Sequence, residues 1–180
     1  MKFTKIITFF CLIVLAAACS PQLSPFTQKL YEDNEWSKAE LKRIQFYLSS
    51  DVKLKRALTG GSSEIVQGKI RMEQGQQIEE LIIPKGTPGV FVFSPKTKRF
   101  AVSFDEDDSK YLMFGANPKA SNRYTLLASE WKRRQGKVTY DGKQWRVDAE
   151  NAMATLLVDL KKVRKVSVDS RVAKGRRIGD

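Results

Sequence analysis

Apolar residues recur with two different periods along the 180-residue chain, and the helical period comes first. Three residues at helical spacing would share one face of a helix: Leu41, Ile44 and Leu48. Ser37 and Glu40 form the S-x-x-E capping box, in which each side chain satisfies a backbone N–H at the helix start. Trp36, just outside the cap, and Leu41 have the spacing of a hydrophobic staple. The pattern predicts a helix from Ser37 to about Ser49.

Beyond residue 50 the apolar pattern changes to that of short strands separated by turns. The wholly apolar run VFVF (90–93) suits a central strand covered on both faces, and RFAVSF (99–104) alternates larger with smaller residues. Asp141-Gly142 suits a two-residue turn that needs positive φ, which predicts a hairpin over 137–147. Its register would place four side chains on one face: Val138, Tyr140, Trp145 and Val147. Four more segments are strand candidates: SEIVQGKIRM, QQIEELIIP, YLMFG and RYTLLASEW.

Residues 149–163 fit both periods, and the sequence does not decide between them. A helical stripe would include Met153, Leu156 and Leu160, whereas Leu156, Val158 and Leu160 alternate as in a strand. Many short strands with turns about every eight to twelve residues are typical of small sandwiches and barrels. The sequence therefore predicts a mainly β fold, a small barrel or sandwich preceded by one N-terminal α-helix.

The first eighteen residues have the three parts of an export signal. Lys2 and Lys5 give a positively charged start, residues 6–15 are apolar, and the small residues 16–18 follow. About ten to twelve apolar residues are too few for a membrane-spanning helix, which needs about twenty. The pattern predicts a signal that is removed, not a retained transmembrane anchor.

The sequence LAAAC, residues 15–19, resembles the lipobox of bacterial lipoprotein precursors. That resemblance implies cleavage between Ala18 and Cys19 by a type II signal peptidase, with a diacylglycerol on the Cys19 sulfur. The alternative is an ordinary secretory signal with a chance cysteine. In that family Ser20 favours the outer membrane, and the lack of acidic residues in CSPQLSP favours its periplasmic face. Cys11 would be excised, so the mature chain would keep no free thiol.

Two further resemblances concern the mature part of the chain. Segment 82–104, IIPKGTPGVFVFSPKTKRFAVSF, resembles the strand-turn-strand middle of bacterial small barrels of the Src-homology (SH3) type. The mature chain as a whole resembles β-rich lipoproteins of Bacteroidota, which implies no particular activity. The expected organisation has four parts: a signal peptide (1–18), a lipidated cysteine and tether (19–34), a single β-rich domain with an N-terminal helix (35–165), and a basic C-terminal tail (166–180).

Several catalytic chemistries lack their residues in this sequence. The chain has no His, which excludes Ser-His-Asp catalysis and His-bound zinc, and a thiol-free mature chain excludes Cys nucleophiles. Chance explains the S-x-x-K pair of Ser129 and Lys132. The acidic run FDEDDSK (104–110) lacks the EF-hand pattern and is expected to be a charged turn. We expect a non-enzyme without cofactor or metal; a carboxylate-dependent glycan hydrolase is the remaining catalytic alternative.

Positive charge is the main indication of a partner. The chain has 32 Lys plus Arg against 20 Asp plus Glu, a formal net charge of +12, which favours anionic partners. Two basic clusters supply the candidate binding residues: Lys132, Arg133, Arg134, Lys137, Arg164, Lys165, Arg176 and Arg177. We expect membrane attachment through Cys19, an envelope protein or anionic glycan as the partner, and no nucleic acid. The alternative is a solvated face followed by a loose tail.

Overall fold

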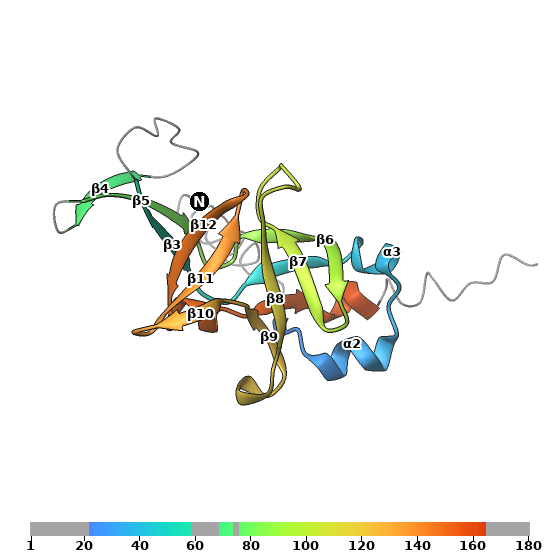
Figure 1. The fold of residues 1–180 in the computed structure, drawn as a ribbon. Helices are drawn as coiled ribbons and strands as arrows, with labels where there is room; N and C mark the ends of the chain where they lie inside the picture. The colour runs from blue at the N-terminus through green and yellow to red at the C-terminus, as the bar shows by residue number, and fades with distance from the viewer. Residues whose placement is uncertain (1–21, 59–68, 74–75, 165–180) are drawn as a thin grey trace, which may run out of the picture.

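The computed structural model describes residues 22–58, 69–73 and 76–164, and within them the chain forms two antiparallel β-sheets (Figure 1). The first sheet has the strand order β1-β13-β2-β6-β7-β8-β9, and the second has the order β10-β11-β12-β3-β5-β4. The predicted mainly β class is confirmed. The closed-barrel alternative is wrong, because β1 and β9 remain the edge strands of the first sheet and only isolated bonds link their ends.

The strands of the first sheet are β1 (Leu23–Pro25), β2 (Gln45–Leu48), β6 (Pro88–Lys96), β7 (Arg99–Ser103), β8 (Tyr111–Asn117), β9 (Arg123–Leu126) and β13 (Leu156–Asp159). The strands of the second sheet are β3 (Val52–Ala57), β4 (Lys69–Glu73), β5 (Gln76–Ile83), β10 (Ser129–Lys132), β11 (Gln135–Tyr140) and β12 (Lys143–Asp148). The described helical segments are α2 (Gln28–Asn34), α3 (Lys38–Leu41) and the 3₁₀ turns η1 (Pro118–Ala120) and η2 (Asn151–Met153).

Aromatic rings gathered around Phe26 form the core of the first sheet. The Phe26 ring centroid lies 5.2 Å from that of Phe46, 5.0 Å from that of Tyr124 and 5.8 Å from that of Phe100. The Tyr124 hydroxyl donates to the Gln28 side chain at 2.7 Å, and burial raises the pKa of this phenol well above its usual range. This cluster fastens the segment before α2 to the sheet.

The expected tether over residues 19–34 is wrong for its described part. Strand β1 pairs with β13 in the first sheet, Phe26 is fully buried, and the Thr27 side chain caps α2 by accepting from the Leu30 backbone N–H. The prolines do oppose helix there, but Pro25 is tolerated on an edge strand because it need not donate to a neighbour. The first element among the described residues is therefore the strand β1, which begins at Leu23.

The predicted helix from Ser37 to Ser49 forms only at its start. The capping box is confirmed: the Ser37 N–H donates to Glu40 at 2.7 Å, and the Glu40 N–H donates to the Ser37 hydroxyl at 3.3 Å. After Leu41 the chain turns into β2, which lies between β13 and β6. Phe46 and Leu48 are buried on the same side of this strand, so the period of two prevails over the helical reading.

The strand that is covered on both faces is β7, and not the predicted run 90–93 in β6. Val90 is 41% exposed and Phe93 is 38% exposed, whereas Phe100, Ala101 and Val102 are all buried. Part of β6 is therefore open to solvent, whereas these three residues of β7 are not. The central position of β6 between β2 and β7 is as predicted.

The predicted hairpin over 137–147 is confirmed in detail. Asp141 and Gly142 form its turn with φ of 51° and 65°, and Val138 pairs with Trp145 across β11 and β12. The four side chains expected on one face are all buried: Val138, Tyr140, Trp145 and Val147. The Trp145 indole N–H also donates to the Tyr140 carbonyl at 3.1 Å.

Residues 149–163 contain both kinds of structure in sequence. The 3₁₀ turn η2 comes first, strand β13 follows, and residues 160–164 are helical. Leu156 and Val158 are fully buried, which is the alternation that the strand reading required.

Candidate functional site

A groove of about 580 Å³ lies at the seam between the two sheets, where β11 of the second sheet contacts β8 of the first. We call it the seam groove. Its walls come from five strands, β6, β7, β8, β10 and β11, and from the segment that joins β9 to β10. The residues that line it are Phe93, Pro95, Lys96, Arg99, Tyr111, Met113, Leu127, Ala128, Ser129, Lys137, Val138 and Thr139.

A β-bulge in β6 brings an aromatic ring into the seam groove. Phe91 pairs with Val102, but Phe93 pairs with Ala101, so the register shifts by one residue between them. Without that shift Phe93 would point into the core together with Phe91, because residues two apart share a face. The extra residue instead turns Phe93 outward, where its ring packs edge-on against Tyr111 with centroids 5.0 Å apart.

Three cations border the seam groove, and none of the described residues lining it is Asp or Glu. Lys96 and Arg99 come from the β6–β7 hairpin, and Lys137 comes from β11. Lys137 forms an exposed ion pair with Glu130. Such exposed pairs stabilise by only about 0–1 kcal/mol, so a ligand anion can replace Glu130 at little cost.

The structure divides the predicted basic residues among different places. Lys137 lines the seam groove, whereas Lys132, Arg133 and Arg134 are exposed at the end of the β10–β11 hairpin. Arg164 is also exposed, but Figure 1 shows residues 160–164 and the β10–β11 turn at opposite ends of the molecule. The remaining predicted site residues lie outside the described residues: Ala18, Cys19, Lys165, Arg176 and Arg177.

The β10–β11 turn holds two arginines in a backbone conformation that favours glycine and asparagine. Lys132 pairs with Gln135, so Arg133 and Arg134 are the two central residues, with φ of 49° and 66°. Each non-glycine residue in this region costs about 1 kcal/mol or more. The Arg134 carbonyl accepts from the Ala149 N–H at 2.8 Å, which fixes the turn against the end of β12. Arginine at positions 133 and 134 therefore exposes positive charge and does not stabilise the turn.

Replacing Arg133 by Asn and Arg134 by Gly is expected to raise the free energy of unfolding by about 1 kcal/mol, because Asn-Gly is the favoured pair for a turn with two positive φ values. Urea unfolding followed by tryptophan fluorescence measures the change. Arg146→Asn, at an ordinary strand position of β12, is the matched control and should give no gain. A lower unfolding midpoint for the Asn-Gly variant would contradict the strain in this turn.

Trp131 packs over the backbone of the same hairpin and leaves half of its surface exposed. A Cβ at Gly136 would lie 2.6 Å from the Ala128 Cβ and 3.1 Å from the Trp131 ring, so only glycine allows this approach. Trp131, 50% exposed, and Met153, 52% exposed, border a second, largely apolar cavity of about 460 Å³ beside η2. Trp131 is thus held at the surface, while Trp36 and Trp145 are core residues.

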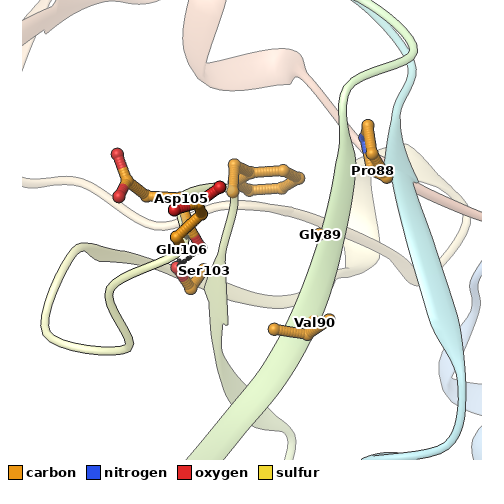
Figure 2. Close-up of a pocket in the computed structure, with 7 residues that line it drawn as sticks. Pro88, Gly89, Val90, Ser103, Asp105 and Glu106 are labelled. Carbon is orange, nitrogen blue, oxygen red and sulfur yellow. Dashed lines mark hydrogen bonds between the residues drawn. The ribbon is translucent and has the colours of Figure 1, made fainter.

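The acidic run after β7 is a turn, as expected, and it borders a shallow pocket of about 400 Å³. Figure 2 shows Ser103, Asp105 and Glu106 on one side of this pocket and Gly89 of β6 on the other. The Ser103 hydroxyl lies 3.0–3.2 Å from three backbone carbonyl oxygens of the turn, any one of which can accept its single proton, and it accepts from the Asp105 N–H at 3.2 Å. The Ser109 N–H donates to the Asp107 carboxylate and lowers its pKa. Ser103 therefore organises the turn and is not poised as a nucleophile.

Neither of the remaining chemical candidates forms a site in the described residues. Ser129 and Lys132 are both exposed on strand β10, and the Ser129 hydroxyl donates to the Lys137 carbonyl oxygen at 3.4 Å. No group of three His, Cys, Asp or Glu side chains in the part of the chain that the structure describes is placed to hold a metal ion.

Few features of the sequence indicate the seam groove. Its aromatic pair and two of its cations come from VFVF, YLMFG and the segment SPKTKRF, which read only as strands and a turn. The density of Lys and Arg in KTKR was the one available signal. Nothing in the pattern shows that β11 packs beside them.

Comparisons with known proteins assign no family. No protein-family model, no curated protein and no solved structure matches the chain. Among the described residues, none of the helices has the length and hydrophobicity of a membrane span. Function is therefore argued from the chemistry of the seam groove and of the basic residues.

Proposed function

We propose that this chain is an outer-membrane lipoprotein, attached through Cys19 and facing the periplasm, whose folded body binds an anionic component of the cell envelope without catalysis. The observation that carries the binding role is the seam groove, in which an aromatic pair and an apolar floor are bordered by three cations and by no carboxylate. Two or three acyl chains at one cysteine would hold the protein firmly, since each buried methylene contributes about 0.8 kcal/mol.

An acidic, partly apolar segment of another envelope protein is the ligand that fits this groove best. Phe93, Met113 and Val138 offer apolar contacts that an aliphatic or aromatic side chain would fill. Lys96, Arg99 and Lys137 would pair with carboxylates at the rim and give the encounter its charge selectivity.

An anionic glycan of the cell wall is the second candidate. The hydroxyls of Ser129 and Thr139 in the groove and the exposed ring of Phe93 support it, because sugars bind through hydrogen bonds and through contact with aromatic rings. Wall polymers carry carboxylates that the same three cations would attract. The two candidates differ in whether purified cell wall retains the protein.

Removing the three cations of the groove tests the binding role. Lys96→Ser, Arg99→Ser and Lys137→Ser together should weaken partner binding at least ten-fold at low salt, because each rim charge contributes roughly 0.5–1 kcal/mol. The matched control carries the same charge loss elsewhere on exposed strands and loops: Lys53→Ser, Lys85→Ser and Lys119→Ser. The assay is crosslinking in intact cells from a photoreactive residue at Thr139, followed by mass spectrometry.

Equal crosslinking by the groove variant and by its control would reject the seam groove as the binding site. Retention of the unaltered protein by purified cell wall, with loss in the groove variant alone, would establish the glycan. Failure to bind wall together with one recurring crosslinked protein would establish the protein ligand.

A further inference from the structure

The chain between the proposed lipid and the folded body is very short. Strand β1 begins at Leu23 and is hydrogen-bonded to β13. Leu23 is four positions after Cys19, and fully extended chain covers at most about 3.6 Å per residue, so the Cα atoms of these two residues cannot be more than roughly 14 Å apart. This step rests on the proposed acylation of Cys19. If the lipid is there, the start of β1 must stay at the bilayer surface.

The residues beside the start of β1 form a basic helical turn. Leu23 is the register partner of Asp159, the last residue of β13, and residues 160–164 follow directly. Val163 is buried in the core, and Leu160 packs against the same core. The outward side chains of this turn are three exposed cations: Lys161, Lys162 and Arg164. Two apolar residues at helical spacing therefore hold three cations in a fixed direction.

The one carboxylate in register with Leu23 does not cancel this charge at the surface. Asp159 is 9% exposed, and its carboxylate accepts from the backbone N–H of Lys161 at 3.0 Å. It caps the helical turn, which leaves the lysine and arginine side chains directed to solvent.

We propose that residues 160–164 lie on the head groups of anionic phospholipids in the membrane that holds the lipid anchor. The short connection brings this turn to the bilayer, and its charge is complementary to phosphate. Each Lys or Arg near an anionic surface strengthens association by about five-fold. The domain would then rest in one orientation, with the start of β1 and the helical turn 160–164 toward the lipid and the β10–β11 turn at the far end (Figure 1).

This orientation gives the two described basic regions different roles. Residues 160–164 hold the domain against its own membrane. Lys132, Arg133 and Arg134, at the opposite end of the molecule, project into the space beyond it and remain accessible to a partner.

The test uses the full chain, processed and acylated in cells, and reconstituted in vesicles. Because the mature chain is thiol-free, a single introduced cysteine carries a fluorophore, either at Lys161→Cys or at the matched distal site Lys132→Cys. The vesicles contain phosphatidylethanolamine and phosphatidylglycerol, with a nitroxide quencher on a fraction of the head groups. We expect quenching at position 161 to exceed that at position 132 several-fold. Lys162→Glu with Arg164→Glu should reduce it by at least half, as should replacing the anionic lipid with phosphatidylcholine.

Mass spectrometry of the same sample separates the two possible failures. If the protein carries no acyl chains at Cys19, the proposed lipid anchor is wrong, and the proposed orientation is rejected together with it. Acylated protein with equal quenching at positions 161 and 132 would leave the anchor intact and overturn the orientation. Quenching at 161 that ignores both the double charge reversal and the lipid charge would overturn the role of the three cations.

Discussion

Cys19→Ser should abolish lipid attachment entirely and leave the signal peptide uncleaved. The serine hydroxyl cannot replace the thiol as acceptor of the diacylglycerol, and the cleavage proposed between Ala18 and Cys19 depends on that lipid. Labelling with a radioactive fatty acid and the intact mass of the purified protein measure the two effects. We expect no label and a mass that retains residues 1–18.

Cys11→Ser is the matched control for this experiment. It removes the other thiol of the chain, which lies inside the apolar run of the signal, and it should be labelled and processed like the unaltered protein. Normal fatty-acid labelling of the Cys19→Ser chain would contradict the lipoprotein assignment. Loss of labelling in both variants would show that the substitutions impair export and not lipid attachment itself.

Arg56→Met should lower the free energy of unfolding by about 3–5 kcal/mol, the largest stability effect that we predict for a single side chain. Glu79 is fully buried, and the Arg56 Nε donates to its carboxylate at 2.5 Å across the β3–β5 ladder. The Arg56 guanidinium also lies 5.3 Å from the centre of the Trp145 ring. Removing the arginine deprives a buried charge of this partner.

A double variant isolates the cause of that loss. Arg56→Met combined with Glu79→Met removes both charges, and it should recover most of the stability because a buried ion pair is readily replaced by apolar side chains. Lys53→Met, exposed on the same strand, is the control and should change stability by about 0.5 kcal/mol or less. Urea unfolding monitored by tryptophan fluorescence measures all three. A double variant as unstable as Arg56→Met would show that the lost packing on Trp145, and not the loss of the ion pair with Glu79, is responsible.

Local signals in the sequence predicted what depends on a few neighbouring residues. The Asp141-Gly142 turn and the capping box of Ser37 and Glu40 form as expected, since both are closed by residues at most three apart. The predicted helix beyond Leu41 is wrong because Ile44 and Leu48 fit both the helical period and the strand period. Only the position of β2 between two long-range partners decides between them.

The seam groove could not be predicted, because no short stretch of sequence contains it. It depends on a one-residue register shift in β6 and on the packing of β11 over strands that come forty residues or so earlier in the chain. Net charge predicted an anionic ligand, which stays a prediction. It could not show that Lys137 faces Lys96 and Arg99 across an apolar floor, nor that Arg164 lies far from the β10–β11 turn.

The pairing of β1 with β13 also constrains when this protein can fold. The first described strand finds its place only beside the last one, so the sheet is incomplete until nearly the whole described chain has emerged. Contacts between such distant segments form slowly, because the loop between them must close first. A chain exported through a membrane would therefore remain unfolded during its passage. Acylation near residue 19 would precede folding, and the finished domain would assemble already fixed to its bilayer.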